Sequence, residues 1–195
     1  MMLETNKRFF IREHAGVFKL TDTYDILDPD SQHQIGVAKD EPATWAKYLR
    51  LVVNKHFLPT TVNIYERDQL VLAIHKPVAL LRSKVTVTRS DGTSLGYFQG
   101  KVFSIGGGFW VFDSSGQQVA EIKGDWKGWN FRFLTSDQSE IGTITKKWAG
   151  LGKELFTSAD NYVIVLNDQH RFRAHDTLLL LAAGIAIDVV FKERK

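Results

Sequence analysis

The chain has 195 residues, of which 44% are hydrophobic and 24% charged, the composition of a globular protein with room for a sizeable core. It contains no cysteine, so disulfides, zinc-thiolate sites, thiol nucleophiles and palmitoylation are excluded. The formal net charge of +3 is compatible with an anionic lipid or nucleic acid as partner, although ordinary surface solvation is the commonest reason for such a balance.

The N-terminal segment, MMLETNKRFFIREH, is charged and lacks the apolar stretch of a signal peptide. We therefore expect a cytoplasmic protein, peripheral at the inner face of the membrane if it meets one.

The first predicted element is a β-hairpin from Tyr24 to Val37, in which alternating apolar residues flank the turn Asp28-Pro29-Asp30. A short amphipathic helix is predicted next, over 43–56, because apolar side chains recur there at helical spacing. Its expected role is to cover one end of the sheet with its apolar side. That side contains Trp45, Tyr48, Leu49, Val52 and Val53, while Lys47, Arg50 and Lys55 lie largely away from it.

Further hairpins follow at nearly regular spacing, each with an Asp-, Ser- or Gly-containing turn between two alternating runs. They are predicted over 62–74, 85–95, 109–119, 131–141 and 156–166. Six hairpins correspond to about twelve antiparallel strands. No Pro/Ser-rich linker separates them, and one sheet closed on itself leaves no exposed edge. A single domain over 1–195 is therefore expected.

The apolar run Thr177–Phe191 raises the question of a membrane anchor. As a helix it spans roughly 22 Å, less than a hydrocarbon core of about 30 Å, and its flanks are basic on both sides. Apolar residues face every direction around it, so it must be surrounded. Asp176 could cap its start, and Asp188 lies four residues before Lys192 on the same face. We predict a barrel wound around this helix, with a core of Leu178, Leu179, Leu180, Leu181, Ile185 and Ile187.

A many-stranded barrel threaded by a C-terminal hydrophobic helix resembles the tubby C-terminal-like superfamily. Individual motifs are similar to its phospholipid scramblase and LURP-one-related branch, including bacterial single-domain members. They are Tyr24–Asp30 with Asp40-Glu41, Val71–Pro77, Leu81–Val85, Asp91-Gly92 through Gly96, Ala159–Tyr162, and Asp188 in the final helix.

The resemblance implies a non-enzymatic protein associated with phospholipid. Eukaryotic members are linked to calcium-dependent movement of lipids between leaflets, and carry a Pro-rich tail, a palmitoylated cysteine cluster and an acidic calcium-binding segment. This chain lacks the tail and the cysteines, and matches the acidic segment only at Asp160 and Asn161, with Asp168 nearby. Calcium is usually coordinated by six to eight oxygen atoms, more than these residues can supply. We therefore expect neither a metal nor another cofactor.

Other candidate motifs favour structural roles. Gly106-Gly107-Gly108 precedes a strand and not the helix that a phosphate-binding loop requires, and 150–153 lacks P-loop spacing. The histidines show neither metal-ligand spacing nor a catalytic triad pattern. The histidines are His14, His33, His56, His75, His170 and His175. The sequence therefore gives no argument for catalysis.

One segment interleaves basic and aromatic residues and is the predicted lipid-binding surface. Basic residues attract anionic lipid and Trp favours the headgroup interface. The alternative is that the Trp side chains plug the end of the core. Lys47 and Arg50 are expected on the same rim of the barrel as these basic and aromatic residues. The lipid-binding residues are Lys123, Trp126, Lys127, Trp129, Arg132, Lys146 and Lys147.

The sequence thus predicts a scramblase-related module at a lipid or membrane surface, with phospholipid scrambling or phosphoinositide and anionic-lipid binding as the implied activities. The alternative is a soluble protein-interaction scaffold with an unknown protein partner and no lipid role. Nucleic-acid binding is disfavoured, because only mild basicity and the Trp/Lys clusters support it.

Overall fold

The computed structural model describes residues 1–14, 21–53, 57–78, 84–100, 108–125, 129–146 and 161–191. Twelve strands and three helices lie within these ranges. The helices are α1 (Met2–Thr5), α2 (Thr44–Leu49) and α3 (Ala174–Phe191). The strands are β1 (Arg8–Glu13), β2 (Thr23–Leu27), β3 (Gln34–Asp40), β4 (Thr60–Glu66), β5 (Gln69–Lys76), β6 (Lys84–Arg89), β7 (Ser94–Gly100), β8 (Gly108–Asp113), β9 (Gln118–Asp125), β10 (Asn130–Leu134), β11 (Glu140–Thr145) and β12 (Tyr162–Leu166).

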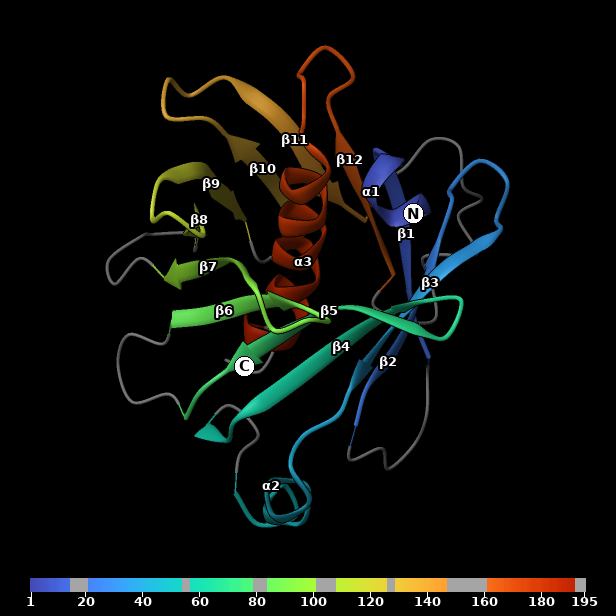
Figure 1. Cartoon of the computed structure of the whole chain (residues 1–195), viewed down its shortest axis with the longest axis vertical. Coiled ribbons are helices and arrows are strands. Elements are labelled where there is room, and N and C mark those ends of the chain that lie inside the picture. The colour runs from blue at the N-terminus through green and yellow to red at the C-terminus, as the bar shows by residue number, and fades with distance from the viewer. Residues whose placement is uncertain are drawn as a thin grey trace.

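The strands form one closed antiparallel barrel in chain order (Figure 1). β1 closes the ring by pairing with β2 on one side and β12 on the other, with Phe9 opposite Ile164. Closure leaves no strand edge exposed. The predicted fold class, a closed barrel of twelve antiparallel strands around a hydrophobic helix, is confirmed.

The hairpin turns are set by short-range hydrogen bonds from aspartate. Asp91 Oδ1 accepts the Thr93 N–H at 2.9 Å, and Asp113 Oδ1 accepts the Ser115 N–H at 2.9 Å. Hydrogen bonds from the hydroxyls of Thr93 and Ser115 hold the pKa of each carboxyl below its usual value. A glycine at positive φ completes each turn, so the repeated sequence pattern produces a repeated turn.

Five of the six predicted hairpins are confirmed, and the last is only partly covered. β12 occupies 162–166, while residues 156–160 of that prediction lie outside the described residues. The twelfth strand is instead β1, which the sequence reading missed. Phe9, Phe10 and Ile11 of β1 are all fully buried, so the strand has no alternating pattern to reveal it.

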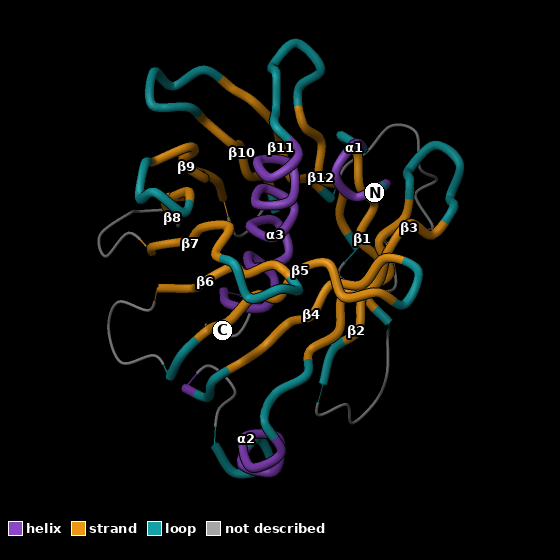
Figure 2. Tube along the Cα trace, viewed as in Figure 1, coloured by secondary structure: helices purple, strands orange, loops and turns teal. Residues whose placement is uncertain are grey.

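The centre of the barrel is filled by α3, which the strands surround in Figures 1 and 2. Leu178, Leu179, Leu180 and Leu181 are at most 2% exposed, and Ile185 and Ile187 are fully buried, as predicted. Because a helix that is apolar all round must be enclosed, the barrel and the helix each require the other. No helix of the described residues combines the length and apolar character needed to cross a bilayer.

The ends of α3 differ in detail from the prediction. The helix begins at Ala174, and Asp176 lies in its first turn, where Oδ2 accepts the Arg173 N–H at 3.0 Å. Lys192 lies outside the described residues, and Asp188 is 1% exposed. Burial raises the pKa of Tyr24, and the Asp188 carboxylate raises it further, so this tyrosine stays neutral inside the barrel.

The two ends of the barrel are built differently. At one end, which we call the turn end, short segments join the strands and α1 packs against α3. Glu66 fixes α1 there by accepting the N–H groups of Met2 at 2.8 Å and Leu3 at 3.1 Å. At the opposite end, the connection end, all but one of the segments that join the strands are longer, and α3 finishes there. The turn end contains segments 28–33, 67–68, 90–93, 114–117, 135–139 and 167–173.

Candidate functional site

Trp129 and Lys146, two of the predicted lipid-contact residues, lie at the connection end, the same end of the barrel as α2. Antiparallel pairing fixes this arrangement, because β3 finishes where β4, β10 and β12 begin and where β11 finishes. The strands there are joined by segments 14–22, 41–59, 77–83, 101–107, 126–129 and 146–161. Segments that are far apart in sequence therefore share one end of the molecule.

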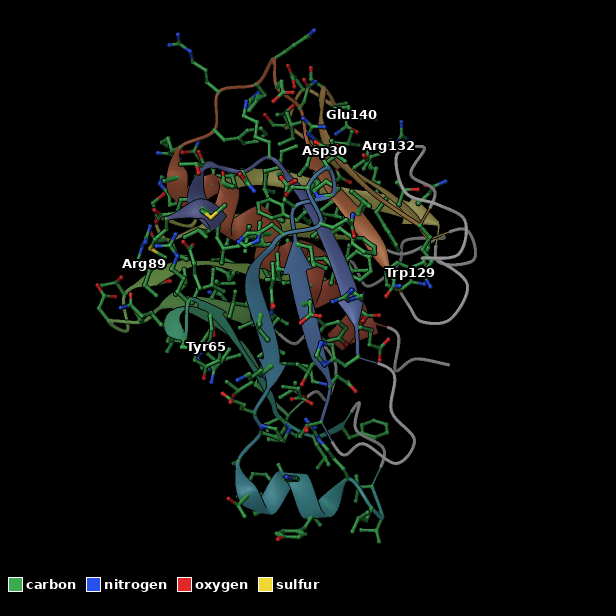
Figure 3. All side chains as sticks on the ribbon, turned by 90° about the vertical axis from the view of Figure 1, so that its right-hand side faces the viewer. Asp30, Tyr65, Arg89, Trp129, Arg132 and Glu140 are labelled. Atoms are coloured by element: carbon green, nitrogen blue, oxygen red, sulfur yellow. The ribbon has the colours of Figure 1, made fainter. Side chains whose placement is uncertain are left out.

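The apolar side of α2 faces solvent, which corrects the prediction that it covers the sheet. Of the helix predicted over 43–56, the structure has Thr44–Leu49 helical and 50–53 as a turn, and 54–56 lie outside the described residues. Trp45 is 55% exposed and Tyr48 64%, and Val52 in the turn is 81% exposed. Ala46 is fully buried and the guanidinium-bearing side chain of Arg50 is 3% exposed, so the opposite side of the helix meets the barrel. Figure 3 shows α2 set apart from the barrel, with side chains pointing away from it.

A buried ion pair explains this orientation. Arg50 Nη1 lies 2.5 Å from Asp40 Oδ2, and Arg50 Nη2 lies 3.2 Å from both Asp40 Oδ1 and Thr60 Oγ1. The Asp40 side chain is 0% exposed. A carboxylate in such a site needs a cation with matching geometry, and arginine supplies two parallel donors. Arg50 therefore turns inward, and the apolar side turns outward with it.

Arg50 is consequently not a free rim cation. The expectation that Arg50 contributes charge at a membrane surface is wrong, because its Nη1 and Nη2 atoms both donate to buried oxygens. Lys47 is exposed on the flank of α2 and remains available.

Two of the predicted lipid-contact residues lie opposite each other on the outer wall. Lys123 of β9 and Arg132 of β10 are register partners. Arg132 is exposed, whereas Lys123 Nζ donates to Gln138 Oε1 at 2.6 Å and lies 3.4 Å from Glu121 Oε1. Part of the Lys123 charge is thus offset locally, and Arg132 is the more available of the two.

Trp129 and Lys146 form a second pair nearer the connection end. Trp129 is 9% exposed and packs against Phe131 and Tyr162 at ring-centroid distances of 5.9 and 5.3 Å. Lys146 Nζ lies 4.6 Å from the Trp129 ring centroid, a cation–π contact. Trp129 therefore plugs the core, as the alternative reading had it, and holds the Lys146 ammonium at the rim. Along the long axis of the molecule, Trp129 lies between Arg132 and α2 (Figure 3).

Three predicted contact residues, Trp126, Lys127 and Lys147, lie outside the described residues. The exposed apolar side of α2 is the feature that sequence reasoning missed. One signal could have indicated it: no aspartate or glutamate occurs between Pro42 and Tyr65, while Lys47, Arg50 and Lys55 are basic.

The fold separates the residues considered for calcium binding, which are Asp160, Asn161 and Asp168. Asn161 Oδ1 accepts the Glu13 N–H at 3.1 Å at one end of β12. Asp168 lies beyond the other end, with its carboxylate 3.4 Å from Lys7 Nζ. A strand rises about 3.3 Å per residue, so these two oxygens cannot bind one ion. Asp160 lies outside the described residues, and among those described no three His, Asp or Glu side chains group around a potential metal position.

Three of the described histidines make contacts that suit structural roles. His75 lies between Thr61 and Thr88 on neighbouring strands, at 3.4 and 3.2 Å. His14 and His175 lie beside Asp25 and Asp176, at 2.8 and 3.0 Å. His56 and the glycine segments 106–107 and 150–153 lie outside the described residues.

A closed antiparallel barrel filled by a helix is a fold that is not typical of enzymes. The Scramblase family model matches residues 18–194, which is most of the barrel and all of α3. The chain therefore belongs to the Scramblase family, a lipid-associated class. Comparison with curated proteins gives no match, and comparison with solved structures gives none either.

Proposed function

We propose that this protein is a non-enzymatic module that docks peripherally on anionic phospholipid at the inner face of a membrane, with its connection end toward the lipid. The observation that carries this proposal is the unequal charge of the two barrel ends. Besides the buried Arg50, the segments joining strands at the connection end contain nine Lys or Arg and four Asp or Glu, whereas those at the turn end contain three and six.

This polarity orients the barrel in the field of an anionic surface. Each Lys or Arg close to such a surface contributes about 1 kcal/mol, and the effect fades beyond a Debye length of about 8 Å at physiological salt. Binding should therefore be salt-sensitive, with the acidic turn end facing away. Membership of the Scramblase family supports lipid as the partner.

Lipid does not have a route through the barrel in this arrangement. The interior is occupied by α3, whose Leu178 to Ala183 side chains are buried against the strands. If the protein promotes lipid movement, it does so from its outer surface, by disturbing the bilayer on which it docks.

The test is co-sedimentation with vesicles of phosphatidylcholine alone and of phosphatidylcholine mixed with phosphatidylserine, at low and physiological salt. We expect binding only to the anionic vesicles, weakened by salt. The variant Lys127→Glu/Lys147→Glu should bind less, while leaving Lys146 on Trp129. The matched control Arg67→Glu/Arg171→Glu reverses two charges at the turn end and should bind as the native chain does.

The exposed apolar side of α2 also suits a second candidate, a protein-interaction scaffold with no lipid role. Absence of binding to any vesicle, together with concentration-dependent self-association or capture of a protein, would favour that candidate. Equal binding by the native chain and by both charge variants would remove the charge polarity from the argument.

A further inference from the structure

Most of the exposed large hydrophobic side chains of the described residues are close together in the sequence. Six of them belong to α2 and the turn after it, and we call the five most exposed of these six the α2 tip. Exposed apolar groups clustered in this way mark an interaction site, whereas scattered ones do not. The α2 tip consists of Trp45, Tyr48, Leu49, Leu51 and Val52, with exposed fractions of 55, 64, 38, 67 and 81%.

We propose that the α2 tip inserts into the interfacial region of an anionic bilayer and is the primary lipid contact of the protein. This inference rests on the proposed function and names the surface that performs it. The tip would enter to the headgroup–acyl boundary, about 5–10 Å deep, as amphipathic helices lying at interfaces do.

The chemistry of the tip fits this occupant. Trp45 and Tyr48 each join an aromatic ring to a polar group, which is the property that concentrates these residues at bilayer interfaces. Leu51 and Val52 are purely aliphatic and are the most exposed members of the tip. Lys47 lies on the flank, where a long side chain can reach lipid phosphates while its stem stays apolar.

Charge complementarity distinguishes an anionic bilayer from a general hydrophobic partner. The stretch from Pro42 to Tyr65, which includes the tip, contains no Asp or Glu, so the tip itself brings no carboxylate toward anionic headgroups. Of the two carboxylates just before it, Asp40 is buried and paired with Arg50, whereas Glu41 is exposed and accepts hydrogen bonds from Asn63 Nδ2 and the Tyr65 hydroxyl. The tip also belongs to the connection end, the basic side of the molecule.

The shape of the tip points the same way. α2 has six residues and projects from the barrel as a convex element (Figures 2 and 3). A stable protein interface usually buries about 800 Å² on each partner over a broad surface. A short convex projection is better matched to a soft lipid interface. The Arg50–Asp40 pair fixes it in the projecting position, so little conformational entropy is lost on docking.

The absence of cysteine allows a direct test with one environment-sensitive fluorophore on each of three variants. Val52→Cys reports on the α2 tip, Arg132→Cys on the outer wall and Ser114→Cys on the turn end, all at exposed positions. Each labelled protein is mixed with phosphatidylcholine vesicles with and without phosphatidylserine. We expect a blue shift, and quenching by a quencher placed in the acyl region, only for the Val52 label and only with the anionic vesicles.

Affinity provides the second measurement. The variant Trp45→Ser/Val52→Ser preserves charge and should lower vesicle partitioning by about tenfold or more, since burying one such side chain is worth at least about 1.5 kcal/mol. A matched change of an exposed polar position at the turn end, Ser114→Ala, should leave partitioning unchanged.

The outcomes separate this inference from the proposed function. If the native chain sediments with anionic vesicles but the Arg132 label shifts and the Val52 label does not, the outer wall is the docking surface and the α2 tip is excluded. If the native chain binds no vesicle, both proposals fail together. A Val52 shift that needs no lipid and grows with protein concentration would assign the tip to a second copy of the chain and overturn the inference.

Discussion

Gly96 lies where β7 passes so close to β8 that no side chain fits between them. A Cβ at this position would meet the Phe112 carbonyl oxygen at 2.1 Å, and the backbone φ is +152°. Both conditions require glycine, because only glycine adopts such a φ without strain and leaves the carbonyl in place. The register shift between Val87 and Thr88 lies on the neighbouring strand, so this is a point where the sheet bends.

Replacing Gly96 by alanine should therefore destabilise the barrel by about 2 kcal/mol or more. The same change at Gly100, on the same strand, meets no heavy atom within 4 Å and should be nearly neutral. Urea unfolding followed by circular dichroism measures both. Similar midpoints for the two variants would contradict the steric argument.

At the scale of elements, α2 and α3 show to what extent the apolar pattern of a helix determines where that helix lies in the fold. Both segments carry large apolar side chains at helical spacing, yet α3 fills the barrel and α2 projects from it. The difference arises from α3 being apolar all round, whereas α2 presents Arg50 to a buried carboxylate. A sequence pattern gives the faces of a helix, but the partner on the barrel decides which face turns inward.

For α3, we expect Leu180→Asp to prevent folding, because the charge would be placed in a site that is 2% exposed. The counterpart Val52→Asp introduces the same charge at a position that is 81% exposed, and should fold normally while losing affinity for vesicles. Expression in soluble form and circular dichroism test both variants. A folded, soluble Leu180→Asp protein would contradict the central position of α3.

For α2, Arg50→Leu should cost about 3–5 kcal/mol of unfolding free energy, because the buried Asp40 carboxylate loses its guanidinium. Lys47→Leu, on the exposed flank, should change stability by no more than about 0.5 kcal/mol. The double variant Asp40→Leu/Arg50→Leu removes both charges and should recover part of the loss. Thermal unfolding of the three variants completes the comparison, and an Arg50→Leu protein as stable as Lys47→Leu would exclude the ion pair as the anchor of α2.

At the scale of the whole molecule, the features that could be predicted are those determined by residues close together in the sequence. The hairpin turns could be predicted because Asp91 and Asp113 bond to residues two positions away. The central helix could be predicted because its surroundings must be apolar. β1 could not be predicted, because its buried residues Phe9 to Ile11 show no alternation and it pairs with β12, far away in the sequence. The candidate site could be predicted only in part. Its basic residues can be identified in the sequence, whereas the outward orientation of the apolar side of α2 depends on the tertiary Arg50–Asp40 ion pair.

The effect of calcium on thermal stability tests whether the whole fold holds a calcium site. Since Asn161 and Asp168 lie at opposite ends of β12 and Asn161 Oδ1 already accepts a backbone N–H, millimolar calcium should leave the melting temperature unchanged. An ion bound tightly, at about a thousandfold excess over its dissociation constant, would add about 4 kcal/mol of stability. Differential scanning calorimetry with and without calcium distinguishes the two, and a calcium-dependent rise would require ligands from residues beyond those described.

The closure of the barrel by β1 and β12, around a helix that follows both in the chain, has a consequence for biosynthesis. A ribosome releases the chain from the N-terminus onward, so β1 emerges long before its partner β12 and before the helix that all the strands enclose. The hairpins can form one by one during elongation, but neither the ring nor its centre can be completed until β12 and α3 have left the ribosome. The nascent chain must therefore carry open strand edges and an unfilled interior until then, and a premature stop before α3 would remove the centre of the whole molecule.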